Sequence, residues 1–275
     1  MRAAGAQAFV AELDYALRLG RSVYGHEGSS PSEGIFQIGE YVLAFQGDIH
    51  GSFGWVIDAV QKVEHLASAL IQVGDWGVNA DIMKRNRKWS QKFKIPVYFI
   101  DGNHEHFELL PQQDGIKEMM PNVFYVPRGE VLVLDGKKIA FLGGAASIDK
   151  EIRIQYNYGW DIRENILPGE VLKLYENVYR DDRPVDIFVS HVPPVNIIKA
   201  YFSDAVKEAY GKDRSWQDPN SLVIQEVWGR LGNPPMFCGH MHRSVGFGNG
   251  CRILGEAELK MYPNEYEGLD KPETP

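Results

Sequence analysis

From residue 41 onward, short apolar runs alternate with segments that have the periodicity of amphipathic helices. The apolar runs cover residues 41–46, 70–73 and 96–100, and the segments between them cover 53–66 and 81–93. Apolar positions spaced three and four residues apart predict helices, whereas short apolar runs bounded by polar residues predict buried strands. Strands that alternate with helices are typical of parallel sheets, so the chain is predicted to be an α/β protein.

The second half is less regular. Further strands are expected at 123–126, 131–134, 138–142, 185–189, 235–238 and 252–254, with a turn at Asp135-Gly136 and a helix at 222–231. Two long aromatic-containing segments, 147–183 and 193–220, interrupt this rhythm; loops of this size either shape a binding site or pack on the surface. We therefore expect an N-terminal extension and linker at 1–40, a domain at 41–262 with insertions at 147–183 and 193–220, and an extended tail at 263–275.

The composition is that of a soluble globular protein, with 275 residues of which 44% are hydrophobic and 24% charged. A net charge of −8 disfavours non-specific binding to nucleic acid, although one local basic groove would be enough for it. No apolar run approaches the ~18 residues of a membrane span, and no signal peptide is evident, so a cytoplasmic protein is expected. The two cysteines, Cys238 and Cys251, are expected to be buried thiols rather than a disulfide.

Five short polar motifs follow the predicted strands. They are Gly-Asp-Ile-His-Gly at 47–51, Gly-Asp at 74–75, Gly-Asn-His-Glu at 102–105, Ser-His at 190–191 and Gly-His-Met-His at 239–242, and they contain five of the eight histidines. A single Asp-x-His or Ser-His could be an ordinary turn or loop. Because the carboxyl ends of parallel strands meet at one sheet edge, the whole set predicts side chains gathered there. Asp, His and Asn are ligands of divalent transition metals, so the set indicates a metal centre.

In this order, the motifs resemble those of the calcineurin-like metallophosphoesterase superfamily over residues 41–254. The resemblance implies a four-layer α/β/β/α sandwich with two divalent metal ions at the sheet edge. It also implies one metal held by Asp48, His50, Asp75 and His242, a second held by Asp75, Asn103, His191 and His240, and His104 beside them as an acid or transition-state stabiliser. Asp75 would bridge both ions and is, with His104, the expected catalytic residue.

Two metals of this kind can share a hydroxide that attacks phosphorus in line, with no covalent enzyme intermediate. Mn²⁺ is the first expectation for the metal, and Fe, Zn, Co or Ni also suit mixed nitrogen and oxygen ligands. A phosphomonoesterase acting on a phosphorylated substrate is slightly favoured. The alternatives are a phosphodiesterase acting on a cyclic nucleotide, a lipid or a nucleic acid, and a non-catalytic scaffold on the same fold. The sequence indicates neither the substrate nor the oligomeric state.

The motifs depart from the Ser/Thr protein phosphatase branch of the family. That branch has a second aspartate where this chain has Val78, followed by an arginine that is absent here, and an arginine where this chain has Asp101. A protein phosphatase is therefore not favoured. Asp101 or Asp81 is a candidate to orient His104.

Substrate contacts are expected from Arg243, Asn103 and His104. An exposed arginine at a loop end is the more ordinary interpretation of Arg243, and the same holds for three cations of the first insertion, Lys150, Arg153 and Arg163. Trp76, which directly follows an expected ligand, either walls the site or packs in the core.

Overall fold

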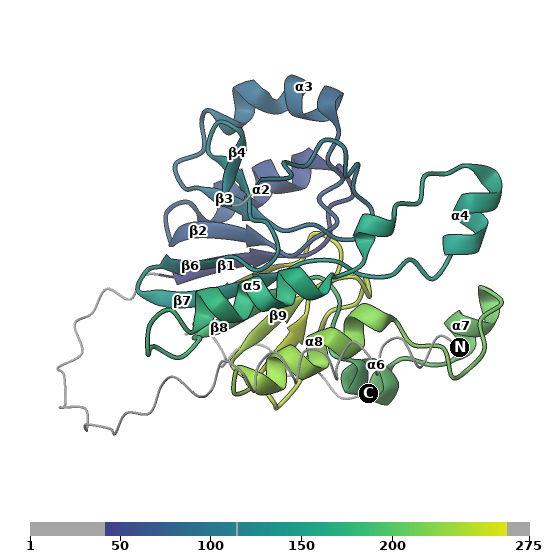
Figure 1. Ribbon diagram of the computed structural model, residues 1–275. Coiled ribbons are helices and arrows are strands. Elements are labelled where there is room, and N and C mark those ends of the chain that lie inside the picture. Colours follow the sequence, from purple (N-terminus) through teal and green to yellow (C-terminus); the bar gives the residue numbers. More distant parts are fainter. Residues whose placement is uncertain (1–41, 114, 263–275) are drawn as a thin grey trace, which may run out of the picture. The chain divides into compact units, whose positions relative to one another are not determined.

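The structure, a computed structural model, describes residues 42–113 and 115–262 (Figure 1). The predicted N-terminal extension at 1–40 and the tail at 263–275 lie outside the described residues, and the domain boundaries stay a prediction. Within the described ranges, no helix combines the length and apolarity needed to cross a membrane.

Two mixed sheets form the centre of the domain. The first has the strand order β12-β1-β2-β3-β5-β4, and the second has the order β10-β11-β9-β8-β7-β6. In each sheet four parallel strands are flanked on both edges by an antiparallel strand. The strands are β1 (Val42–Gln46), β2 (Ala67–Gln72), β3 (Val97–Phe99), β4 (Lys117–Met120), β5 (Val123–Tyr125), β6 (Val131–Leu134), β7 (Lys137–Leu142), β8 (Ile187–Ser190), β9 (Met236–Cys238), β10 (Val245–Gly246), β11 (Cys251–Ile253) and β12 (Leu259–Tyr262).

Helices cover the outer face of each sheet. The first sheet carries α2 (Phe53–Val63) and α3 (Ala80–Ser90), and the second carries α5 (Pro168–Val178) and α8 (Pro219–Arg230) (Figure 1). This arrangement confirms the four-layer α/β/β/α sandwich. The remaining helices are α4 (Lys150–Tyr156), a 3-10 turn at Ile162–Glu164, α6 (Val195–Tyr201) and α7 (Ala205–Ala209).

The alternation of side chains along each strand divides the core in two. Along β1, Leu43 and Phe45 face the layer between the sheets, whereas Ala44 packs toward α2. Phe45 stacks on Phe237 of β9 with ring centroids 3.8 Å apart. This contact joins the two sheets through strands that both lead directly into polar motifs.

The structure differs from the sequence predictions mainly outside the motifs. The segment 168–178, expected to be a loop, is the helix α5, which begins with Pro168 and buries Val171, Leu174 and Tyr175. Its apolar positions have helical spacing, and the surrounding polar residues obscured that pattern. The edge strands β4, β10 and β12 were not predicted, because short edge strands carry little apolar signal. The predicted turn at Asp135-Gly136 is confirmed, with both residues in the left-handed region that tight hairpins use.

Candidate metal centre

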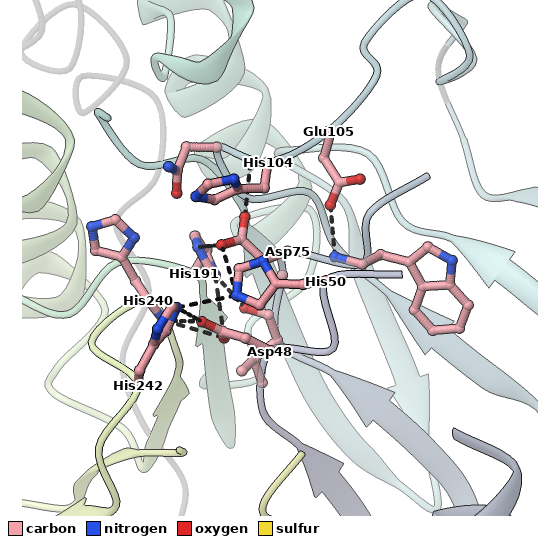
Figure 2. A network of polar contacts seen from close by, with 12 residues as sticks. Asp48, His50, Asp75, His104, Glu105, His191, His240 and His242 are labelled. Carbon is pink, nitrogen blue, oxygen red and sulfur yellow. Dashed lines mark hydrogen bonds and ion pairs between the residues drawn. The ribbon is translucent and has the colours of Figure 1, made fainter. Parts of the chain in front are cut away.

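Loops at the carboxyl ends of parallel strands deliver the motif residues to one place (Figure 2). Two of the strands that feed the cluster, β8 and β9, belong to the second sheet, and the other three belong to the first. The cluster receives Asp48 and His50 after β1, Asp75 after β2, His104 after β3, His191 after β8, and His240 and His242 after β9. Asn103 directly precedes His104 in the loop after β3.

The candidate ligands form two groups that share one carboxylate. Each residue of a group offers one ligand atom, and within a group these atoms lie within 4.8 Å of one another. The first group is Asp48, His50, Asp75 and His242, and the second is Asp75, His191 and His240. Apart from Asn103, these groups contain the residues that the family resemblance divides between two metals, with Asp75 common to both.

Four of these residues have a backbone conformation that L-amino acids rarely adopt. The φ angles are 44° at His50, 54° at Asp75, 68° at His240 and 51° at His242. A left-handed non-glycine residue costs of order 1–3 kcal/mol and persists where surrounding structure imposes it. The two left-handed residues in the Gly-His-Met-His motif bend the chain, so that two histidines separated by one residue both reach the cluster.

Two motif glycines allow the loops to pack closely. A Cβ atom on Gly102 would lie 2.1 Å from Oδ1 of Asp75 and 2.7 Å from Nε2 of His191. A Cβ atom on Gly239 would lie 2.0 Å from Oδ1 of Asp48. Any larger residue at either position would therefore push a candidate ligand aside.

Unpaired polar atoms show that the cluster suits a cation. Oδ2 of Asp75, Oδ1 of Asn103 and Nε2 of His191 are buried and have no hydrogen-bond partner in the described part of the chain. The Asp75 and His191 atoms lie 3.3 Å apart, close but without hydrogen-bond geometry. A buried polar atom without a partner, such as Oδ1 of Asn103, costs about 1–3 kcal/mol. The Asp75 and His191 atoms compensate each other by charge but lack a hydrogen bond. All three are ligand atoms for divalent metals, so the residues present fit the pair of ions that the family implies.

Hydrogen bonds outside the cluster orient the imidazoles. Nδ1 of His191 donates to the carbonyl oxygen of Val73 at 2.9 Å, which leaves Nε2 directed at Asp75. Nδ1 of His242 lies 3.2 Å from Oε1 of Glu256, and its Nε2 lies 3.3 Å from Oδ2 of Asp48. Metal-binding histidines commonly use the second ring nitrogen in this way.

The sequence analysis missed two carboxylates beside the cluster. They are Glu256, which contacts His242, and Asp218, whose Oδ2 lies 4.0 Å from Nε2 of His240. Glu256 follows β11, a parallel strand of the second sheet, so its position after a strand was the signal that could have identified it. Asp218 instead caps α8, accepting the backbone N–H of Asn220, and burial raises its pKa to about 7.

Charges in the cluster strongly perturb its ionisation. Burial opposes the charge on Asp75, but the adjacent His191 outweighs it and lowers the pKa of Asp75. Burial lowers the pKa of His191, but Asp75 and Asp48 raise it to about 10, so the metal-free pair is ionic. Burial and the neighbouring His191 lower the pKa of His240 to about 3. The pKa of His104 is also lowered, first by burial and then by Arg153, against the attraction of Asp75.

A chain of hydrogen bonds from the first insertion fixes the amide of Asn103. Nδ2 of Asn103 donates to Oγ of Ser147 at 3.0 Å, and that hydroxyl donates to Oε2 of Glu164 at 2.6 Å. Oε1 of Glu164 accepts from the backbone of Ser147 and from Nε1 of Trp160. Because Nδ2 is held outward, the unpaired Oδ1 is the atom of Asn103 left for a metal.

Neither candidate for orienting His104 does so. The carboxylate of Asp101 is buried and binds Nε of Arg128 at 2.8 Å and the hydroxyl of Tyr125 at 3.0 Å. Asp81 lies exposed in the first turn of α3, where the chain runs toward the outer layer. The predicted role of Asp101 or Asp81 as partner of His104 is therefore wrong, since neither makes a hydrogen bond to it.

Two other residues near the motifs have packing or bracing roles. Trp76 is 2% exposed and stacks on Phe99 with centroids 4.4 Å apart, so it belongs to the core and does not wall the site. The carboxylate of Glu105 accepts the backbone N–H groups of Trp76 and Val78 at 2.7 and 2.8 Å. Glu105 thereby ties the loop that follows Asp75 to the Gly-Asn-His-Glu motif.

The four cations considered from the sequence lie in different surroundings. Nη2 of Arg153 lies 2.9 Å from both ring nitrogens of His104. Arg163 pairs with Asp161 and Glu108, and Lys150 packs 3.8 Å from the ring centroid of Trp160. Arg243 is exposed, and its predicted substrate contact stays a prediction.

The family match agrees with this geometry. The family model described as calcineurin-like phosphoesterase matches residues 41–244. No curated protein matched the chain. Among solved structures, the chain is similar to phosphopantetheinyl hydrolase from Mycobacterium tuberculosis, with 14% identity, a TM-score of 0.47, and coverage of 86% of this chain and 99% of that one.

Gly102→Ala is expected to abolish tight metal binding, because the new methyl group would collide with Asp75 and His191. Mn²⁺ affinity measured by calorimetry should fall by more than about 100-fold, beyond the usual effect of changing an outer hydrogen-bond partner. Gly54→Ala is the matched control, since a Cβ there meets no atom within 4 Å and alanine favours helices. Unchanged Mn²⁺ affinity in Gly102→Ala would contradict the close packing described above.

Ser147→Ala is expected to lower metal affinity by about 10–100-fold, because the Asn103 amide loses the partner that orients it. Equilibrium dialysis with metal analysis would measure the change. Ser90→Ala is the control: Ser90 is also buried, but its hydroxyl donates to the backbone carbonyl of Arg87 and it lies at the end of α3. Equal affinities for the two variants would argue against this role of Ser147.

Metal binding near pH 8 is expected to release a proton. The pKa of His191 is about 10 in the metal-free protein, so this imidazole is protonated at pH 8 and must lose a proton before it can bind a cation. Calorimetric titration with Mn²⁺ in two buffers of different ionisation enthalpy measures the number released. A binding enthalpy that does not depend on the buffer would rule out this ionic pairing.

Proposed function

Because the chain belongs to the calcineurin-like phosphoesterase family, we propose that it is a hydrolase of phosphate esters that uses two divalent metal ions. The observation that carries the proposal is the pair of ligand groups that share Asp75. Asp48, His50, Asp75 and His242 would hold one ion, and Asp75, Asn103, His191 and His240 the other. The unpaired buried atoms of Asp75, Asn103 and His191 support this assignment.

Two bound divalent ions would supply a water-derived nucleophile at neutral pH and draw charge from the phosphate oxygens. The protein's own contribution begins with Asp75, whose Oδ1 accepts the backbone N–H of His104 at 2.9 Å. This bond ties the shared carboxylate to the His104 loop. The imidazole of His104 is exposed, so a substrate can reach it. Burial lowers the pKa of His104, so the protonated ring is a stronger acid toward a leaving oxygen, and a smaller fraction of it is protonated near pH 7.

The finer parts of the proposal are the substrate class, the metal and the location. We favour a phosphomonoester, with a phosphodiester as the competing class, and Mn²⁺, which suits mixed nitrogen and oxygen ligands. A cytoplasmic location agrees with Cys238 and Cys251, which are both free thiols and buried. The partner would be a phosphorylated molecule rather than a nucleic acid, in keeping with the net charge of −8.

The test is hydrolysis of p-nitrophenyl phosphate and bis-p-nitrophenyl phosphate by metal-stripped protein refilled with Mn²⁺. Two Mn²⁺ per chain and faster turnover of the monoester are expected. Asp75→Asn should reduce kcat/KM by more than about 100-fold, because it weakens both metal sites at once. Asp58→Asn, which changes an exposed carboxylate of α2, should leave the rate unchanged.

Faster turnover of the diester would replace the monoester assignment and keep the rest of the proposal. Protein that binds no metal and hydrolyses neither ester would contradict the enzymatic assignment and favour a scaffold on the same fold. Equal rates for Asp75→Asn and the unaltered protein would show that the activity arises elsewhere.

A further inference from the structure

Arg153 is a nearly buried cation that the first insertion places against the candidate metal centre. It lies in α4, and its Nη2 is 2.9 Å from both ring nitrogens of His104. The side chain of Arg153 is only 11% exposed, although no residue of α4 is buried as a whole. An ordinary arginine on a surface helix would extend into solvent. The Arg153 side chain instead extends toward the cluster.

The guanidinium is held in this orientation but not fully paired. Nε of Arg153 donates to Oδ1 of Asp149 at 2.9 Å, one helical turn earlier. Beyond Asp149 and His104, no hydrogen-bond partner of its nitrogens is found among residues 42–113 and 115–262. A guanidinium has five N–H donors and no acceptor, so it cannot itself bind a metal. The side facing His104 is therefore suited to an anion.

The motifs of this chain lack two arginines of the Ser/Thr protein phosphatase branch. One would follow the position of Val78, and the other would stand in place of Asp101. In the described ranges, the only guanidinium that contacts Asp101 is that of Arg128. Its N–H groups donate hydrogen bonds to Asp101, Glu170 and backbone oxygens. Arg153 approaches His104 from the insertion instead.

We propose that Arg153 binds a non-bridging oxygen of the substrate's phosphoryl group, next to His104, and selects phosphomonoesters over diesters. The inference rests on the proposed function and adds the residue that selects its substrate class. The planar fork of an arginine matches phosphate oxygens and forms strong charge-assisted hydrogen bonds with them. A monoester dianion carries one more negative charge than a diester, so it gains more from this cation.

The same contact would connect substrate binding to the position of α4. Because α4 buries no residue, polar contacts hold it: Arg153 with His104, and Glu151 with Lys212 of the second insertion. A phosphate bound by Arg153 adds a further contact to this helix. The amide hydrogens of residues 150–156 should then exchange more slowly when phosphate is present.

The test compares Arg153→Ala and Arg153→Lys with Arg180→Ala, using Mn²⁺-loaded full-length protein. Arg180 is an exposed arginine just after α5, in the connection that leads to the amino end of β8, which is the sheet edge opposite the ligands. Binding of inorganic phosphate, measured by calorimetry, should weaken about 10–100-fold in Arg153→Ala and recover partly in Arg153→Lys. Phosphate should slow exchange at 150–156 in the unaltered protein and in Arg180→Ala, but not in Arg153→Ala.

The rates give the second readout. Arg153→Ala should lower kcat/KM for p-nitrophenyl phosphate by about 100-fold, the size expected for one lost oxyanion donor, and that for the diester by less than about 10-fold. Metal content should equal that of the unaltered protein. Unchanged phosphate affinity in Arg153→Ala, or equal losses on both esters, would overturn the proposal. Loss of metal in both Arg153 variants would also overturn it, since Arg153 would then be structural.

The two proposals fail differently. If the Mn²⁺-loaded protein hydrolyses neither ester, the proposed function fails, yet the phosphate titrations still decide the role of Arg153. If the unaltered protein hydrolyses esters but binds no phosphate, or binds it independently of Arg153, the proposed function stands and this inference is wrong.

Discussion

Asp75 carries its carboxylate in a position with no access to solvent, where an isolated charge would be strongly unfavourable. One oxygen accepts the backbone N–H of His104, and the other lies 3.3 Å from His191 of the other sheet. The charge is thus compensated only when loops from both sheets are in place. The close approach of Gly102 and the left-handed conformation of Asp75 itself are part of the same arrangement. The candidate metal centre therefore depends on the packing of the two sheets against each other.

The strand and helix pattern was sufficient for the α/β class and for polar side chains gathered at one sheet edge, because each motif directly follows a strand and parallel strands end at a common edge. The four-layer sandwich and the division of the ligands between two metals came from the resemblance of the motifs to the family. It was not sufficient for the residues that support the ligands. Ser147 and Glu164 act on Asn103 across gaps of 44 and more positions, and no local pattern marks them. Arg153 was one of several comparable cations, and only the tertiary contact with His104 sets it apart. Helix α5 was missed because polar residues surround its apolar positions.

The contacts of Asp101 show that the residue before a motif can stabilise the fold instead of binding substrate. In this chain the residue before Gly102 pairs inward, with Arg128 and Tyr125, and so braces the end of β3. A residue used in that way cannot also face a substrate. In our proposal, Arg153 of the insertion that follows β7 binds the substrate phosphate. Recognition could then change with the insertion while the strand ends and the ligands stay as they are.

The pairing of the first and last described strands has a topological meaning. Strands β1 and β12 are antiparallel neighbours, with Leu43 opposite Tyr262 and Gln46 opposite Leu259. Gln46 leads into the ligand loop, so the Leu43–Tyr262 pair lies at the far edge of the sheet, away from the metals. The first and last described strands of the domain are therefore neighbours. A circular permutation that joins them and opens the chain at a surface turn would keep every strand neighbour, so the arrangement of the ligand loops does not depend on which strand comes first.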